Sequence, residues 1–308
     1  MTSGRDRFDL QSLRLLVAIG QRLSIGKAAA DVGLSQPSAS LRLGELERKI
    51  GVTLVERSPS GSRLTPIGKT VAGWARQVVD AGDTFVHSVR MLRDQKERRF
   101  TAVVSKTIAD HLMPGWLVAM HAGTPDVTVA LEVADPDTVV ERVRTGGAGV
   151  GFVEGDVSLG GLRSRKIGDT ELMVVVGSGH PLRGRAPLDL AGLAEIPLVL
   201  RESGCGSRAA LEKALAAIGA RPTVAVEMAS TAAIKAVVAA GDGVTVLSSL
   251  AVASDVRTGR LVVLPLVGGP LRLPLHAVWH RGSQPVGPGR DLLAIATGVR
   301  GQVRPGNA

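Results

Sequence analysis

The chain has 308 residues, of which 44% are hydrophobic, and its formal net charge at pH 7 is +9. This length and apolar content suffice for two or three domains, each with its own core. No stretch near the start combines a basic segment, an apolar segment and a small-residue cleavage site, so we expect a protein that is not secreted. The single cysteine, Cys205, excludes a disulfide scaffold or a multi-cysteine metal site within one chain. These features fit the reducing cytoplasm.

The positive charge is concentrated in the N-terminal third. Residues 1–100 hold 17 Lys and Arg against 10 Asp and Glu, whereas residues 101–308 hold 20 against 18. Such an asymmetry suggests contact with a polyanion at this end, although a solvated helical surface would carry the same charge. The most apolar window, residues 234–253, contains Asp242 between two glycines. We therefore interpret it as a buried helix and strand and expect no membrane span.

Two short helices are predicted at the start of the chain. A first helix over about residues 9–21 is indicated by an apolar stripe of Leu10, Leu13, Leu16, Val17 and Leu23. Ser24 is suited to cap a second helix. Gly33 is suited to end it, because a turn between helices commonly needs a left-handed residue.

A third helix follows, with Ser35 as its cap and Pro37 in its first turn, where the missing N–H costs nothing. Its core-facing stripe consists of Ala39, Leu43, Leu46 and Ile50. Off that stripe lie Gln36, Pro37, Ser38, Leu41 and Arg42.

The first turn of this third helix has the chemistry of a DNA major-groove reader. A helix that approaches base edges there needs small residues with short donors and acceptors. Gln36 suits adenine, Ser38 suits a base or a phosphate, and Arg42 suits guanine or a phosphate. A plain three-helix core with an ordinary cap would explain the serine at the cap, but the joint pattern favours a helix-turn-helix.

A basic β-hairpin is predicted after the third helix. The segment "VTLVERSPSGSRLT" has the pattern of two short strands around a turn at Ser58–Ser62, with Arg57 and Arg63 beside it. A basic wing next to a helix-turn-helix usually lies along the DNA backbone or minor groove. Each phosphate contact would steepen the salt dependence of binding by about 0.9 in log–log slope.

The first ninety residues resemble the winged helix-turn-helix of LysR-type transcriptional regulators. The matching segments are "SIGKAAADVGLSQPSASLRLGELERKIGVTLVER" and "LTPIGK". The resemblance implies a DNA-binding role for Ser35, Gln36, Pro37, Ser38, Ser40 and Arg42, and a wing role for Arg57, Arg63 and Thr65. Three positions depart from the family pattern: Val55 replaces the usual Phe, Leu41 stands where a polar or basic residue is more common, and Gly44 interrupts the third helix. These departures leave the operator sequence open.

A long linker helix is predicted from Pro66 to about Arg93. Val71, Val78, Phe85 and Leu92 recur every seven residues, with Ile67, Trp74 and Ala81 at the complementary positions. Such a seam is typical of a coiled coil, although a monomeric helix could bury it against its own domain. We expect a dimer joined through Val71, Trp74, Val78, Phe85 and Leu92, since a palindromic DNA site needs two recognition helices. The resemblance points the same way, and often to tetramers.

From Phe100 onward, apolar strands alternate with helices, which predicts an α/β fold with mainly parallel sheets. The expected domains are a winged helix-turn-helix over residues 1–65, a linker and dimerisation helix over 66–96, and an effector domain over 97–308. Here the resemblance implies a two-lobed, periplasmic-binding-protein-like fold of type 2, with crossings near Gly168–Glu171 and Leu271–His276. Lobe I would span about 100–168 and 276–303, and lobe II about 171–271.

Hydroxyl, glycine and arginine residues gather at several predicted helix starts in this region. Ligands of open α/β folds bind at the carboxyl ends of strands, where helix N-termini favour anions. We therefore expect a small anionic effector, most simply a carboxylate, bound by Ser105, Thr107, Arg201, Gly204, Cys205, Gly206, Ser207, Ser230, Thr231 and Ser248. Each of the Ser and Thr residues could also serve only as a helix cap.

Other patterns do not carry a function. The glycine run at 146–151 follows a predicted helix and opens a strand, the reverse of a nucleotide-binding loop. No cluster has metal-ligand spacing, no nucleophile–base pair is evident, and we expect neither a cofactor nor an enzyme. Cys205 beside arginines could act as a redox sensor, but a small buried residue is the simpler interpretation.

Two other classes of protein remain as alternatives. A binding protein or enzyme with a basic tail predicts no sequence-specific DNA binding, and an architectural DNA protein predicts little sequence preference. The family resemblance favours a regulator that binds a partly palindromic promoter site, responds to an effector and contacts RNA polymerase.

Overall fold

The computed structural model describes residues 8–58, 61–96, 99–184, 186–241, 243–282 and 284–298. The chain divides into two compact units, residues 1–86 and 87–308. Each unit is described separately below. None of the helices in these described ranges has the length and apolar character needed to cross a bilayer.

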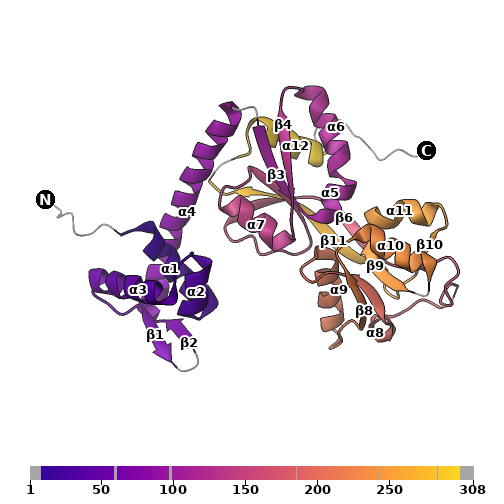
Figure 1. Ribbon diagram of the computed structural model, residues 1–308, viewed down its shortest axis with the longest axis horizontal. Helices are drawn as coiled ribbons and strands as arrows, with labels where there is room; N and C mark the ends of the chain where they lie inside the picture. Colours follow the sequence, from indigo (N-terminus) through magenta and orange to yellow (C-terminus); the bar gives the residue numbers. More distant parts are fainter. Residues whose placement is uncertain are drawn as a thin grey trace. The chain divides into compact units, whose positions relative to one another are not determined.

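The first unit holds three short helices, a two-stranded wing and the start of a long helix (Figure 1). These elements are α1 (Leu10–Arg22), α2 (Ile25–Asp31), α3 (Gln36–Ile50), β1 (Val55–Ser58), β2 (Gly61–Leu64) and α4 (Pro66–Lys96). Strands β1 and β2 pair antiparallel, with Glu56 opposite Arg63.

Side-chain caps set the starts of the three short helices. Asp9, Ser24 and Ser35 each accept a hydrogen bond from a backbone N–H in the first turn of α1, α2 and α3, respectively. Gly33 has a φ of +68°, which permits the tight turn between α2 and α3. The three predicted helices and the caps Ser24 and Ser35 are therefore confirmed, whereas the cap Asp9 was not predicted and Leu23, expected on the apolar stripe of the first helix, is exposed just after α1.

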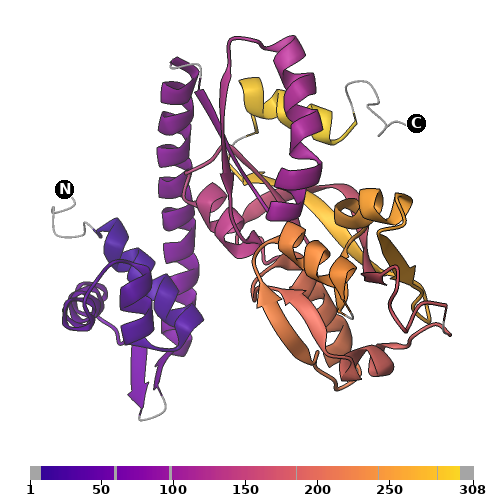
Figure 2. The same cartoon turned by 45° about the vertical axis from the view of Figure 1, so that its right-hand side comes forward.

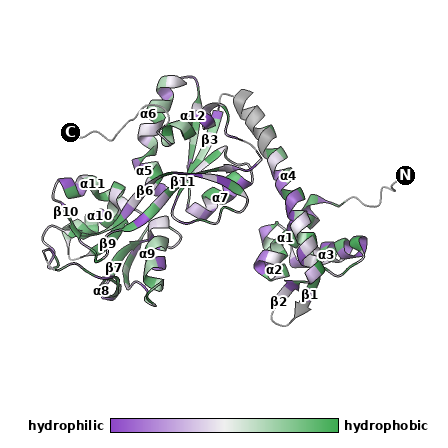
Figure 3. Ribbon diagram, turned by 180° about the vertical axis from the view of Figure 1, so that it is seen from behind, coloured by the Kyte–Doolittle hydropathy of each residue, from purple (hydrophilic) through white to green (hydrophobic). Residues whose placement is uncertain are grey.

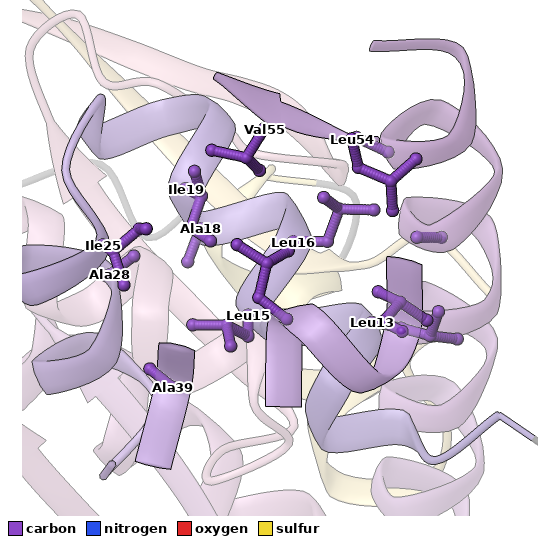
Figure 4. Packing of buried hydrophobic residues seen from close by; sticks show 14 of the residues in the cluster. Leu13, Leu15, Leu16, Ala18, Ile19, Ile25, Ala28, Ala39, Leu54 and Val55 are labelled. Carbon is purple, nitrogen blue, oxygen red and sulfur yellow. The ribbon is translucent and has the colours of Figure 1, made fainter. Parts of the chain in front are cut away.

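The core of the first unit is formed mainly by α1, and Figure 4 shows its packing. Leu15, Leu16 and Ile19 of α1 are almost completely buried, and they share the cluster with Leu54 and Val55 at the base of the wing. One face of α4 closes this core through Ala72, Ala75 and Val79. The start of α4 is thus part of the first unit.

The second unit is a two-lobed α/β structure (Figure 2). Its strands are β3 (Arg99–Val104), β4 (Thr128–Val133), β5 (Val150–Glu154), β6 (Leu162–Gly177), β7 (Leu198–Arg201), β8 (Val224–Met228), β9 (Val244–Ser248), β10 (Leu261–Leu264) and β11 (Leu271–His280). Its helices are α5 (Lys106–His111), α6 (Met113–Gly123), α7 (Pro136–Arg144), α8 (Leu190–Glu195), α9 (Gly206–Ala216), α10 (Thr231–Ala240), α11 (Ser249–Arg257) and α12 (Gly287–Ala296).

The long strands β6 and β11 connect the two lobes. The sheet order is β4-β3-β5-β11-β6-β9-β7-β8, and β10 also pairs with β6. β11 shifts register between Leu275 and His276, opposite Gly168 to Lys166 of β6. In this arrangement β3, β4 and β5 belong to lobe I, and β7 to β10 belong to lobe II.

The expectation of mainly parallel sheets is only half right. The pairs β3–β4, β3–β5, β7–β8 and β7–β9 are parallel, but β6 and β11 pair antiparallel with each other and with β5, β9 and β10. Strands that run back and forth between two lobes reverse direction at each crossing, which the alternation of strands and helices does not reveal.

Helices cover both faces of the sheet in each lobe, and the central strands between them are mostly hydrophobic (Figure 3). In lobe I, Phe152 of β5 packs with Ile108 and Met113 on one face, and Val139 and Val143 of α7 cover the other. This packing on both faces holds the carboxyl ends of β3 and β5 in place within lobe I.

Candidate DNA-binding surface and effector site

The start of α3 presents small polar groups to solvent. Ser35, Gln36, Pro37 and Ser38 are all exposed. The Ser35 hydroxyl accepts a hydrogen bond from the Ser38 backbone N–H at 3.3 Å and lies 2.8 Å from the Ser38 hydroxyl. Ser40 is half-buried, one turn further along. A groove of DNA could approach this turn without displacing any bulky side chain.

Arg42 is held at the edge of this surface by Asp9. Its guanidinium donates a hydrogen bond to the Asp9 carboxylate at 3.1 Å, and both side chains remain substantially exposed. Burial alone would raise the pKa of Asp9, but hydrogen bonds from Ser12 and the charge of Arg42 outweigh it and lower the pKa below the usual value. The pair orients Arg42 without removing it from solvent.

The wing residues have different surroundings. Arg63 is exposed on β2, whereas the side chain of Arg57 lies outside the described part of the structure. Thr65 is buried: its hydroxyl donates to the Thr53 carbonyl at 3.0 Å and accepts from the Gly68 N–H at 2.8 Å. This geometry gives Thr65 a structural role at the start of α4, where its hydroxyl joins the segment before the wing to the first turn of the helix.

The apolar seam predicted on α4 divides between two faces. Trp74, Val78 and Phe85 are exposed, by 63%, 51% and 70% respectively. Val71 instead is half-buried against the core of its own unit. The side chain of Leu92 is outside the described range. The exposed residues form an apolar face on one side of the helix, spaced by four and seven residues.

Three predicted effector residues lie around the end of β5 in lobe I and the start of α9 in lobe II. Thr107 donates a hydrogen bond to Glu154 Oε1 at 3.0 Å. A Cβ on Gly206 would lie 2.6 Å from Glu154 Cγ, so the backbone of α9 packs directly on this side chain. Arg201 is near enough for its charge to act on Glu154. Glu154 is thus the point at which residues of the two lobes meet.

Arg201 is buried and already paired. Its guanidinium donates to both carboxylate oxygens of Glu202, at 2.6 and 2.7 Å, and to the Thr231 hydroxyl at 3.0 Å. Cys205 and Ser207 are buried beside it, with 3.3 Å between their sulfur and oxygen atoms. Arg201 therefore organises the helix starts of lobe II more than it offers a free cation.

The remaining predicted effector residues have other neighbours. Ser230 is exposed and caps α10, and Gly204 is exposed in the turn before α9 with a φ of +89°. The Ser248 hydroxyl lies 2.7 Å from that of Thr170 and caps α11. Ser105 is buried at the start of α5, where its hydroxyl has no protein partner in the described residues.

Glu154 was not among the residues predicted from the sequence. It is 1% exposed, and its Oε2 atom has no hydrogen-bond partner among the described residues. Burial raises the pKa of Glu154 to about 7, although the Thr107 hydrogen bond and the Arg201 charge act to lower it. A glutamate directly after the apolar run "GVGFV", at a strand end, is the signal that could have found it.

Comparison with known families decides the identity of the fold. Residues 10–69 match the family model of the bacterial regulatory helix-turn-helix protein, lysR family, and residues 93–298 match that of the LysR substrate binding domain. The chain belongs to the LysR family of transcriptional regulators. It is a DNA-binding regulator with an effector-binding domain, as the sequence resemblance implied.

Relatives and solved structures agree with this assignment. An HTH-type transcriptional regulator of Mycobacterium tuberculosis is 36% identical over 299 residues, covering 94% of this chain and 96% of the relative. A full-length OxyR variant from Pseudomonas aeruginosa has a TM-score of 0.57 and 24% identity, covering 96% of this chain and 100% of that one. The CcmR regulatory domain of Synechocystis in complex with 2-PG has a TM-score of 0.60 and 22% identity, covering 67% of this chain and 98% of that one.

The polar side chains of the candidate effector site do not form a metal-binding cluster in the described part of the chain. Across the described ranges, no group of three or more His, Cys, Asp or Glu side chains could hold a metal ion. The polar residues at the lobe boundary are hydroxyls, one buried carboxyl and one buried guanidinium. That set suits recognition of a small polar molecule.

Proposed function

We propose that this LysR-type regulator binds a partly palindromic promoter site as a dimer, reads bases with the first turn of α3, and responds to a small effector held between its lobes. Its relatives are transcriptional regulators, and we propose that the chain acts by binding and carries no catalytic activity. Because its target is promoter DNA, its place of action is the cytoplasm.

The proposal for DNA rests on the exposed polar start of α3. Gln36, Ser38 and Arg42 supply short and long donors on the solvent side of a helix whose other side is buried. Such a helix places its N-terminal residues on base edges, and the wing with Arg63 follows the backbone. RNA polymerase contact is implied by the family resemblance alone.

The proposal for a dimer rests on the apolar face of α4. Trp74, Val78 and Phe85 expose large side chains on one side of a helix whose other side is already packed. Exposed apolar patches of this kind mark protein interfaces. A second copy of α4 would cover them and supply the second recognition helix that a palindrome requires.

The effector would act by population shift. The effector changes regulation only if it binds one arrangement of the lobes more tightly than another. The favoured arrangement must also change how the DNA-binding units of the assembled protein are positioned on the promoter. The strands β6 and β11, with their register shift at Leu275 and His276, are the elements through which the lobes could move.

Sedimentation velocity of the full chain, combined with selection from random-sequence DNA, tests this function. We expect a dimer or larger assembly and a selected site with two inverted half-sites about one helical turn apart, or a multiple of that spacing. Phe85→Ser is expected to weaken the dimer and palindrome binding together. Val267→Ser, which changes an exposed valine of lobe II, is the control. A monomeric wild type, or a selected site with a single half, would contradict the proposal.

A further inference from the structure

At the carboxyl ends of β3 and β5 in lobe I, two buried polar atoms lie close together in the fold without a hydrogen-bond partner among the described residues. They are Ser105 Oγ, just after β3, and Glu154 Oε2, at the end of β5. A backbone hydrogen bond of 2.9 Å from Ser105 N to the Phe152 carbonyl holds these two strand ends side by side. Leaving buried polar groups without a partner is costly, so natural proteins keep few of them, and those few call for an explanation.

Glu154 faces the other lobe. Its Oε1 atom accepts from Thr107, and its side chain is covered by the Gly206 backbone at the start of α9. The charge of Arg201, from lobe II, acts on the same carboxyl. A molecule bound between the lobes at this point meets the Glu154 carboxyl from the lobe I side.

The ionised Glu154 carboxylate requires a donor from the ligand, whereas the Ser105 hydroxyl can either donate or accept. An ionised Glu154 accepts hydrogen bonds only, and its natural partner is a positively charged amine. Arg201 acts on Glu154 through its charge, but its guanidinium donates its hydrogen bonds to Glu202 and Thr231 and not to Glu154 Oε2. From lobe II, the starts of α9 and α10 offer backbone N–H groups to a negative group.

We propose that the effector is an α-amino acid, whose ammonium group binds Glu154 and Ser105 and whose carboxylate faces the starts of α9 and α10. This inference rests on the proposed effector site and names its ligand class. The proposal also replaces the simple anion that the sequence predicts. A carboxylate without an amine would bring no hydrogen-bond donor to Glu154 Oε2. Since Gly206 covers Glu154, the amino acid enters when the lobes part.

Thermal unfolding of the full-length protein tests the proposal. The probes are the twenty standard amino acids and, for each one that stabilises, the matching carboxylic acid that lacks the amine. A ligand that binds only the folded state stabilises it by RT ln(1 + L/Kd) at free ligand concentration L, so the rise of the unfolding temperature with ligand concentration gives the affinity. The variants are Glu154→Gln, Ser105→Ala and the control Asp156→Asn, which removes an exposed acid paired with Lys213.

We expect at least one amino acid to stabilise the wild type while its deaminated counterpart does not. Glu154→Gln should lower that affinity about ten- to a hundredfold, Ser105→Ala less, and Asp156→Asn little. Stabilisation by the acids alone, retained in Glu154→Gln, would overturn the proposal and leave an anion site. No stabilisation by any amino acid would overturn it as well. DNA binding by the same preparation separates either result from a failure of the proposed regulator function.

A second inference concerns Leu41, which is 67% exposed on α3. It lies on the side of the helix opposite the buried Ala39, Leu43 and Leu46, three residues after Ser38 and four after Pro37. Three residues further on, a Cβ at Gly44 would have nothing within 4 Å, so DNA could approach the backbone closely there. An apolar side chain in the major groove recognises the methyl group of thymine.

The geometry points to Leu41 as a specificity residue that reads a thymine methyl group in each half-site. In the selected site, each thymine is replaced singly by uracil, which removes only that methyl. One position per half-site should lose about fourfold in affinity, the worth of one buried carbon. Leu41→Ala should bind thymine and uracil equally at that position while still responding to changes elsewhere. If no uracil substitution matters to the wild type, or if Leu41→Ala keeps the preference, the inference is wrong.

Discussion

Arg42 of the recognition helix donates a hydrogen bond to Asp9, the residue that caps α1, at 3.1 Å. The pair joins the helix that we propose reads DNA to α1, which contributes more buried residues to the core of this unit than any other element. Both side chains are partly exposed, so the ion pair contributes less than about 1 kcal/mol to stability. A DNA phosphate or base can therefore compete with Asp9 for the guanidinium.

Arg42→Ala is expected to weaken binding to the selected DNA and to reduce the log–log salt slope by about 0.9 if Arg42 contacts a phosphate. Asp9→Asn keeps a good cap, because Asn and Asp cap helices about equally, and it removes a negative charge near the DNA. The DNA affinity of Asp9→Asn at low salt should therefore be higher than that of the wild type. Fluorescence anisotropy across a salt series measures both variants. Unchanged affinity and discrimination in Arg42→Ala would remove this residue from the interface.

Gly68 sits where the wing meets α4. A Cβ there would lie 2.0 Å from the Leu54 carbonyl oxygen, so Gly68→Ala must displace backbone. We expect a loss of about 1–3 kcal/mol in the unfolding free energy of the DNA-binding unit, together with weaker DNA binding. Gly73→Ala, in the same helix with open space around the site, should gain up to about 1 kcal/mol. Equal unfolding curves for the two variants would contradict this packing.

Glu154 predicts an unusual dependence of stability on pH. Burial raises its pKa from an ordinary 4.5 to about 7, so the folded state binds more protons than the unfolded state between these values. Stability contributed by this group therefore falls as pH rises through that window. Glu154→Gln should be more stable than wild type by about 3 kcal/mol at pH 8, and by much less at pH 5. The difference in urea unfolding at the two pH values measures it, with Asp156→Asn as control. A stability difference that does not grow between pH 5 and pH 8 would contradict a raised pKa of Glu154.

Thr107→Val keeps the shape of the side chain and removes the donor to Glu154 Oε1. We expect the effector domain to lose about 1–3 kcal/mol, since a second carboxyl oxygen is left without a partner. DNA affinity, measured by gel shift, should stay within about twofold of wild type, because the residue lies in the other unit. A drop as large as that of Arg42→Ala would contradict the separation of the two sites.

The local chemistry of the sequence was enough to predict the first unit. Ser24 and Ser35 act on backbone groups within the next few residues, so these two caps could be recognised without knowing the tertiary fold. The seam on α4 was harder. Val71 and Trp74 both fit an apolar repeat, and only the position of the first three helices shows that Val71 faces its own core while Trp74 faces solvent.

The effector site shows the opposite case. Thr107, Arg201 and Gly206 were predicted as separate helix starts, but the residue that joins them, Glu154, was missed. Its burial depends on Gly206 arriving from the other lobe, which no local pattern encodes. Thr65 was predicted at the DNA, and its bonds to Thr53 and Gly68 are likewise set by tertiary contacts.

The central claim is that the start of α3 reads a specific DNA sequence. The most direct measurement is competition binding on genomic fragments selected by the full-length protein, with each selected fragment and its scrambled version titrated across a salt series. The account predicts a discrete complex that survives scrambled competitor at physiological salt and is lost in Ser38→Ala and Arg42→Ala. Equal affinity for selected and scrambled DNA, disappearing at modest salt, would show charge attraction without sequence reading and would contradict it.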